Sequence, residues 1–268
     1  MDELKKYLDA AIEAALLGGE VLKKHWGKLK SIDFKSAPGD LVTDADKASE
    51  ACIFEYLLRT TPDFGILGEE SGFLTNGKSE SADYLWVVDP LDGTTNFAHK
   101  FPFFAVSIGL VHQGEPIVGV IFNPYFQELF IASKGKGAYL NGERIEVSQT
   151  KEIKDSLLAS GFAYDRREVE DNNYKEFCHL TNLTHGVRRA GAASLDLASV
   201  AAGRVDGYWE RGLKHWDVAA GIIIVKEAGG VVSSYEKGPV DINSGKILAT
   251  NGFIHSQLSA ELMQLKNN

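Results

Sequence analysis

Five short apolar or alternating runs between residues 104 and 147 restrict this chain to a fold that contains an antiparallel sheet. The runs are 104–111, 116–122, 128–132, 138–140 and 144–147. Turn sequences separate them, and Asn141-Gly142 between two such runs is a strong hairpin signal. The pattern predicts a meander in which neighbouring strands are also neighbours in the sequence.

Two amphipathic helices are predicted before this meander. Apolar residues from Leu4 to Trp26 recur at helical spacing and indicate the first helix. The second begins near Thr43, where Asp46 three residues later completes a capping-box pattern, and runs to about Arg59. Its predicted apolar face is formed by Ala48, Ala51, Cys52, Tyr56 and Leu57. Residues 33–40 are predicted as a polar connector and residues 75–83 as a surface loop.

The pattern changes near residue 150, where strands and helices begin to alternate. Strands are predicted at 157–160, 186–189, 205–210 and 246–250, and helices at 170–180, 194–202, 217–228 and 255–265. Such alternation is typical of an α/β arrangement. We therefore predict an α+β lobe over residues 1–148 and an α/β lobe over residues 149–268, packed as one compact unit.

Composition excludes several classes of partner. The formal net charge of the 268 residues is −9, which argues against nucleic acid or an anionic membrane as the main partner because both require a basic surface. Cys52 and Cys178 are too few for a disulfide scaffold. Neither a signal peptide nor a membrane-spanning run is visible. A cytoplasmic location is therefore expected.

The stretch from Tyr84 to Phe97 carries the strongest chemical signal. An apolar strand, 84–88, is predicted to end at Asp89, with Pro90 stopping the ladder. Asp92-Gly93-Thr94-Thr95 then has the composition of a helix start, with Asp92 as a possible N-cap. Carboxylates bind hard cations such as Mg²⁺, and free N–H groups at a helix start bind phosphate. The stretch therefore predicts a site where a metal and a phosphate meet.

Further acids occur at similar positions elsewhere in the chain. Asp44 and Asp46 open a helix, Glu69 and Glu70 follow a short strand at 64–67, and Asp217 opens an apolar helix. Each could be only a helix cap or an exposed loop acid. If these segments converge, however, their carboxylates require cations, while the helix starts attract an anion. Phosphate held among magnesium ions satisfies both, as in two-metal displacement at phosphorus.

The motifs together resemble those of the inositol monophosphatase family, within the lithium-sensitive, magnesium-dependent phosphatases. The matching segments, in the family's order, are 40–46, 68–72, 86–97, 103–108, 135–142 and 191–221. Asp89-Pro90-Leu91-Asp92-Gly93-Thr94-Thr95 and Trp216-Asp217 are the most specific parts. The resemblance implies a layered αβαβα sandwich, commonly a homodimer, and convergence of the acidic segments.

The resemblance also implies roles for individual residues. Two or three Mg²⁺ ions would be held by Glu69, Asp89, the carbonyl of Leu91, Asp92 and Asp217. Asp46 and Thr94 would position the attacking water, with Glu69 contributing to catalysis through the metal. Phosphate would be bound by Gly93, Thr94 and Thr95. The alcohol part of the substrate would contact Asp92, Gly191, Ala192, Ala193 and Glu210.

The expected substrate is a small phosphorylated polyol, with inositol 1-phosphate first. Fructose 1,6-bisphosphate, histidinol phosphate, NADP and a 3′-phosphoadenosine nucleotide are alternatives, the last being the least favoured. A non-catalytic metal-binding interaction protein is the alternative from a different class, although every carboxylate position implied by the resemblance is filled. Arg188 and Arg189 could be surface charges or could face a second anionic group.

Overall fold

The computed structural model describes residues 3–35, 40–74, 83–240 and 245–266. The first half contains α1 (Glu3–His25), β1 (Ile32–Phe34), β2 (Leu41–Thr43), α2 (Asp44–Thr60), β3 (Gly65–Gly68), β4 (Gly72–Leu74), β5 (Tyr84–Asp92), α3 (Thr94–Ala98), β6 (Ala105–His112), β7 (Glu115–Asn123), β8 (Glu128–Ser133), β9 (Ala138–Leu140) and β10 (Glu143–Ile145). The second half contains a 3₁₀ turn (Ile153–Asp155), β11 (Leu157–Ser160), α4 (Tyr174–Leu183), β12 (Gly186–Arg188), α5 (Ala193–Ala201), β13 (Gly207–Glu210), α6 (His215–Glu227), β14 (Val231–Ser233), β15 (Ile247–Thr250) and α7 (His255–Lys266).

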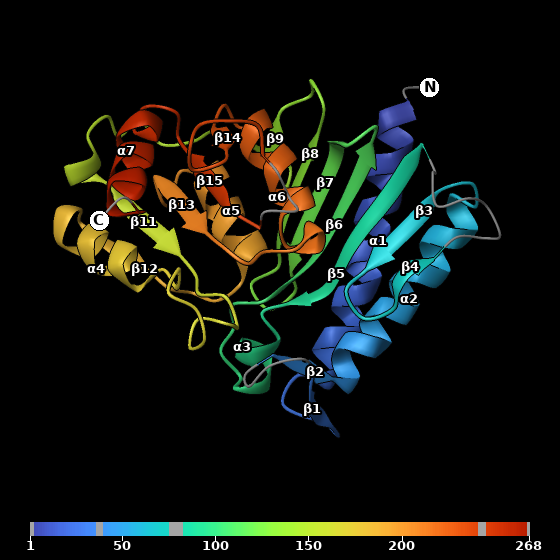
Figure 1. Ribbon diagram of the computed structural model, residues 1–268. Coiled ribbons are helices and arrows are strands. Elements are labelled where there is room, and N and C mark those ends of the chain that lie inside the picture. The colour runs from blue at the N-terminus through green and yellow to red at the C-terminus, as the bar shows by residue number, and fades with distance from the viewer. Residues whose placement is uncertain (1–2, 36–39, 75–82, 241–244, 267–268) are drawn as a thin grey trace.

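These elements form five layers, as Figure 1 shows. Helices α1 and α2 pack on one face of an eight-stranded sheet, and α5 and α6 lie between that sheet and a five-stranded sheet. Helices α4 and α7 pack together on the outer side of the second sheet. The predicted αβαβα layering is confirmed. No helix in the described part of the chain is both long enough and apolar enough to cross a membrane.

The two sheets follow the change of pattern seen in the sequence. The first has the order β10-β9-β8-β7-β6-β5-β3-β4, and all of its pairs are antiparallel except β3 with β5. The predicted meander is therefore confirmed. The second has the order β12-β11-β13-β15-β14 and is mixed, because β15 runs antiparallel to both of its neighbours. One apolar core joins residues of both sheets, including Ile121 and Ile247, while the division at residue 148 stays a prediction.

Helix α6 is apolar on every side because it is packed between the layers. Its residues from Val218 to Val225 are all buried. It approaches the first sheet where β6 and β7 carry Gly109 and Gly119: a Cβ on either glycine would overlap α6 at Ala219 or Ala220. Only glycine lets the helix lie this close to the strands.

Several predicted boundaries are wrong. Residues 33 and 34 of the predicted polar connector belong to β1, which pairs with β2. Residues 36–39 of that connector and 75–82 of the predicted surface loop lie outside the described residues. The predicted helix at 170–180 begins four residues later, at Tyr174, and ends at Leu183. The buried face of α2 is Ala45, Asp46, Ser49, Glu50, Ile53, Phe54 and Leu57, so the predicted face was rotated.

Candidate active site

Strand β5 continues through Pro90 to Asp92, so the predicted end at Asp89 is wrong. Its register against β6 is irregular at this point: Asp89 lies opposite Ser107, and Asp92 lies opposite Ala105. Three steps along β5 thus match two along β6, the arrangement of a β-bulge. In a regular strand, residues three apart face opposite sides. The extra residue brings Asp89 and Asp92 to the same side, and Pro90 is tolerated because the ladder is already interrupted.

Both aspartates are almost fully buried. Oδ1 of Asp89 accepts a hydrogen bond from the Leu91 N–H at 3.0 Å. Oδ2 of Asp92 accepts bonds from the Ser194 N–H at 2.7 Å and the Ser194 hydroxyl at 2.5 Å. Burial raises the pKa of Asp92, and burial together with the charges of Glu69 and other acids raises the pKa of Asp89 well above its usual range. Ionising these groups therefore requires compensating positive charge.

Two more acids reach the same place from distant segments. Asp217 is the third residue of α6, not its N-cap as one alternative held, and its Oδ2 accepts a bond from the Lys214 N–H at 2.6 Å. Burial, with Glu69 and Asp92 nearby, raises the pKa of Asp217 well above its usual range. Burial raises the pKa of Glu69 to about 7, although Lys35 Nζ lies 2.7 Å from its Oε1 and opposes that shift.

This donor set fits a divalent cation. Four carboxyl groups come together from β5, α6 and the turn after β3, and the charges of Glu69 and Asp92 raise the pKa values of both Asp89 and Asp217. Hard cations bind such oxygen ligands. In the described ranges, no group of three or more His, Cys, Asp or Glu side chains is arranged closely enough to hold a metal ion. Lys35, Ser194 and the Lys214 N–H instead donate to Glu69, Asp92 and Asp217, respectively.

The region next to these acids contains the start of α3. This helix begins at Thr94, with Gly93 at the N-cap position in a left-handed conformation (φ 90°), so Asp92 is not the cap. The hydroxyl of Thr94 lies 2.8 Å from Oδ1 of Asp46 and 3.0 Å from the Leu91 carbonyl oxygen. Asp46 is fully buried, and its Oδ2 also accepts bonds from the N–H and hydroxyl of Thr43, which confirms the predicted capping box.

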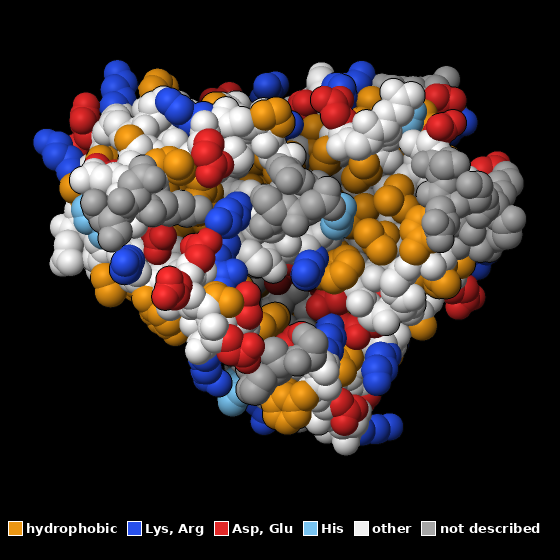
Figure 2. Space-filling view, in the orientation of Figure 1, with side chains coloured by type: hydrophobic (Ala, Val, Ile, Leu, Met, Phe, Trp, Pro, Cys, Tyr) orange, Lys and Arg blue, Asp and Glu red, His pale blue; other side chains and the backbone are white. Residues whose placement is uncertain are grey.

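A cavity of about 420 Å³ joins the two ends of the expected site. Nine of the predicted residues line it: Asp92, Gly93, Thr94, Thr95, Gly191, Ala192, Ala193, Glu210 and Asp217. Asp46, Glu69, Asp89 and Leu91 are not among its lining residues, although contacts and charge connect them to those that are. Figure 2 shows this face of the molecule hollowed near its centre, close to where α3 and the end of β5 lie in Figure 1.

The far end of the cavity combines acidic, basic and aromatic groups. Glu210 ends β13, and the hydroxyl of Tyr208 donates to its Oε2 at 2.6 Å. Burial raises the pKa of Glu210 to about 7, while Arg189 partly opposes the shift. Arg166 and Arg189 line the cavity, whereas the neighbouring Arg188 is not among the lining residues. Arg188 and Arg189 are both exposed.

Several residues at the site were not predicted, among them Arg166 in the lining of the cavity. Lys35 bridges Glu69 and Glu70, Glu50 accepts bonds from the turn after β3, and Ser194 binds Asp92. Asn96 donates to the carbonyls of Phe103 at 2.7 Å and Ala190 at 2.9 Å, which ties α3 to the loop before α5. Only Glu50 had a sequence signal, as a carboxylate three and four residues before Ile53 and Phe54.

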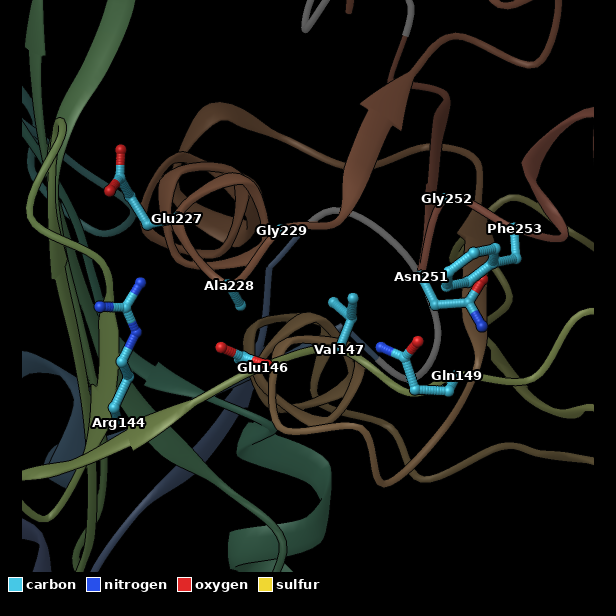
Figure 3. A pocket seen from close by; sticks show the side chains of 10 residues that line it. All are labelled: Arg144, Glu146, Val147, Gln149, Glu227, Ala228, Gly229, Asn251, Gly252 and Phe253. Atoms are coloured by element: carbon cyan, nitrogen blue, oxygen red, sulfur yellow. The ribbon is translucent and has the colours of Figure 1, made fainter.

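A second cavity, of about 510 Å³, contains none of the predicted residues in its lining (Figure 3). Its polar groups are partly engaged in the fold: the carboxylate of Glu227 accepts bonds from the N–H groups of Gly135 and Gly137, each at 2.7 Å. The amide of Asn251 donates to Ser148 and to the carbonyl of Thr150. Glu227 and Asn251 thus hold the neighbouring loops in place.

The layered fold, with clustered acids beside a helix start, is that of an α/β protein with a candidate site for a metal ion and a phosphate. The family model described as "Inositol monophosphatase family" matches residues 3–267. The chain belongs to the inositol monophosphatase family. It is 54% identical over 260 residues to an inositol-1-monophosphatase of Synechocystis, covering 97% of this chain and 90% of that relative.

Two further comparisons agree with this assignment. The solved structure of an inositol monophosphatase from Anabaena has 55% sequence identity and a TM-score of 0.89, with coverage of 98% of this chain and 97% of that one. A relative from Aquifex aeolicus named fructose-1,6-bisphosphatase/inositol-1-monophosphatase is 43% identical over 235 residues, which is 86% of each chain.

Proposed function

We propose that the protein is a Mg²⁺-dependent phosphomonoesterase that hydrolyses a small polyol phosphate, with inositol 1-phosphate as its preferred substrate. One observation carries the proposal: a single cavity is lined both by the acids and loop expected to bind metal and phosphate and by the residues expected to contact an alcohol. Its volume of about 420 Å³ lies within the roughly 300–1,000 Å³ typical of small-molecule sites.

One group of residues would bind the metal ions. Glu69, Asp89, Asp92 and Asp217, with the Leu91 carbonyl, would hold two or three Mg²⁺ ions. When bound, the metal lowers the pKa of a coordinated water and neutralises charge on the phosphate and the leaving oxygen.

The chain itself orients the reactants. The N–H groups of Gly93, Thr94 and Thr95 would hold the phosphate, with the macrodipole of the short α3 contributing little. Oδ1 of Asp46 fixes the Thr94 hydroxyl, and this pair would accept a hydrogen bond from the attacking water. General-base assistance of this kind contributes about 10²–10⁴-fold to a rate.

At the other end of the cavity, Glu210 would contact substrate hydroxyl groups. The hydroxyl of Tyr208 holds one of its oxygens, which fixes the orientation of the carboxyl group. Because burial brings its pKa to about 7, Glu210 can accept or donate a hydrogen bond near neutral pH. Gly191, Ala192 and Ala193 have small side chains that leave space for a polyol ring beside it.

A sugar bisphosphate is the second candidate substrate. Arg166 and Arg189 line the same cavity as the phosphate loop, and guanidinium groups bind phosphate well. The name of the Aquifex relative, which includes fructose-1,6-bisphosphatase, supports the same alternative. Histidinol phosphate and NADP remain further candidates.

Phosphate release tests the proposal. Purified protein is assayed under identical Mg²⁺ on inositol 1-phosphate, fructose 1,6-bisphosphate, histidinol phosphate, NADP and adenosine 3′,5′-bisphosphate. We expect Mg²⁺-dependent, lithium-inhibited turnover, fastest on inositol 1-phosphate and abolished by Asp92→Asn. Absence of Mg²⁺-dependent turnover on every substrate would favour the non-catalytic interaction protein. Size-exclusion chromatography with light scattering tests the accompanying proposal of a homodimer, and fractionation of cells tests the proposed cytoplasmic location.

A further inference from the structure

The turn that carries Glu69 is short and lies near the edge of the first sheet. It consists of residues 69–71, between β3 and the edge strand β4, and Gly68 pairs with Gly72 across its base. The Glu69 N–H donates to the Val88 carbonyl at 3.2 Å. Among the described strands, β4 has a sheet neighbour on one side only, so contacts outside the sheet help to place this turn.

Glu50 supplies those contacts from the helix beneath. It lies on α2, its side chain is buried with 2% of the residue exposed, and both of its carboxylate oxygens are directed to the turn. Oε2 accepts a bond from the Glu70 N–H at 3.0 Å, and Oε1 accepts one from the Ser71 hydroxyl. Burying a carboxylate destabilises the folded state unless it is hydrogen-bonded. The turn therefore stabilises the buried Glu50 side chain, and Glu50 in turn fixes the position of the turn.

Packing leaves little freedom for this arrangement. A Cβ on Gly68 would overlap the Glu50 carboxylate and the ring of Phe54. The end of β3 therefore rests directly on the side chains of α2. The same helix begins with the Thr43–Asp46 capping box, so α2 connects the residue expected to aim water with the turn that carries an expected cation ligand.

Lys35 also contacts the turn, through the side chains of Glu69 and Glu70. Its Nζ lies 2.7 Å from Oε1 of Glu69 and 2.5 Å from Oε1 of Glu70. Lys35 thus contacts the side chains of both glutamates. Glu50 instead contacts the backbone N–H of Glu70, and the Glu69 side chain is directed to Asp89.

We propose that Glu50 is a positioning residue for the cation site, which holds the 69–71 turn so that the Glu69 carboxylate faces Asp89. This inference rests on the proposed role of Glu69 and Asp89 as cation ligands. Partners that orient metal ligands without touching the metal change metal affinity about 10- to 100-fold when they are removed. A residue that merely stabilised the fold would change the unfolding temperature and leave Mg²⁺ affinity as it was.

Titration calorimetry of Mg²⁺ into the substrate-free protein tests this role. Glu50→Gln keeps the shape of the side chain but replaces one acceptor oxygen with an NH₂ group that cannot accept from an N–H or a hydroxyl. We expect Mg²⁺ affinity to fall about 10- to 100-fold, and turnover on inositol 1-phosphate to recover as Mg²⁺ is raised. Glu55→Gln is the matched control, since Glu55 is an exposed glutamate on the same helix, and it should leave the affinity unchanged.

Ser71→Ala removes one of the two bonds without altering a buried charge, and it serves if Glu50→Gln does not fold. It should weaken Mg²⁺ binding by a smaller factor, and the double variant should lose less than the product of the two single losses because both act through one contact. Unchanged Mg²⁺ affinity in folded Glu50→Gln, or in Ser71→Ala where Glu50→Gln does not fold, would overturn the inference. Glu69→Gln and Asp89→Asn test the proposed cation site separately from the role of Glu50. If these two variants bind Mg²⁺ with the affinity of the parent protein, Glu69 and Asp89 are not cation ligands, and the proposed function fails at that point.

Discussion

The Thr94 hydroxyl lies 2.8 Å from Oδ1 of Asp46, although the two residues are separated by 48 positions. Asp46 receives two further bonds from Thr43, so a fully buried carboxylate joins the start of α2 to the start of α3. This contact orients the hydroxyl group expected to bind the attacking water.

The first prediction concerns this pair. Asp46→Asn should lower kcat by about 10²–10⁴-fold, because an amide cannot take the proton-accepting role, while the affinity for Mg²⁺ stays near that of the parent protein. Thr94→Ala should cause a comparable loss, and Thr94→Ser, which keeps the hydroxyl, should retain most of the activity. Steady-state kinetics with Mg²⁺ titration checks this; equal activity of Thr94→Ala and Thr94→Ser would contradict the role of the hydroxyl.

The second prediction concerns pH. Burial raises the pKa of Glu69 from 4.5 to about 7 and raises the pKa values of Asp89 and Asp217 as well. In the metal-free protein, the folded state therefore holds more protons than the unfolded state between about pH 4.5 and 7, and the free energy of unfolding should fall as pH rises through that window.

Mg²⁺ should reverse this trend, because it binds the ionised carboxylates and competes with protons. Thermal unfolding at pH 5.5, 6.5 and 7.5, with EDTA and with Mg²⁺, measures both effects. A metal-free protein that gains stability with rising pH over this range would show that burial does not raise the pKa values of Glu69, Asp89 and Asp217 as described.

The third prediction uses two neighbouring arginines. Arg189→Gln should lower kcat/KM for fructose 1,6-bisphosphate by roughly 10-fold or more, the value of one lost charged hydrogen bond, with a smaller effect on inositol 1-phosphate. Arg188→Gln is the matched control, since Arg188 is exposed like Arg189 but does not line the cavity. Equal effects of the two substitutions on both substrates would exclude a specific anion contact at Arg189.

The fourth prediction concerns Gly93, whose φ is 90°. In Gly93→Ala, the added Cβ would lie 3.0 Å from the Phe103 carbonyl oxygen and 3.2 Å from Cβ of Ala192. Strain and crowding should together destabilise the protein by about 1–3 kcal/mol or more and reduce turnover by moving the phosphate loop.

Gly114→Ala separates the two causes. Gly114 has a φ of 81° but lies in an exposed turn with nothing within 4 Å of an added Cβ. It should therefore show the conformational cost alone. Unfolding in urea measures both variants, and equal free-energy changes would indicate that crowding at Gly93 has no effect.

Much of this architecture was predictable because local signals and the fold agree. The meander from β6 to β10 follows from turn sequences such as Asn141-Gly142, and the capping box at Thr43 follows from residue spacing. Strand β14 was missed because it is three residues long and follows Gly229-Gly230, where no alternation can be read. The end of β5 was misplaced because Pro90 usually interrupts a strand, whereas here it occupies a bulge.

The site was predictable as a set of residue types but not as a set of contacts. Lys35 and Ser194 lie far in sequence from the acids they bind, and no spacing rule connects them. Glu50 was detectable in principle, because a carboxylate on the face of α2 shared with Ile53 and Phe54 is unusual. The predicted apolar face of that helix included neither Ile53 nor Phe54, so this signal was not used.

The close approach of α6 to Gly109 and Gly119 has a consequence for evolution of the protein. Asp217 lies in the first turn of α6, and Asp89 lies on the strand next to the one that carries Gly109. Any larger side chain at either glycine would push the helix outward and carry Asp217 away from Asp89. The permitted distance between two expected ligands of one ion is thus set by residues that touch neither metal nor substrate, and substitutions at these glycines would impair the enzyme while leaving every acidic residue in place.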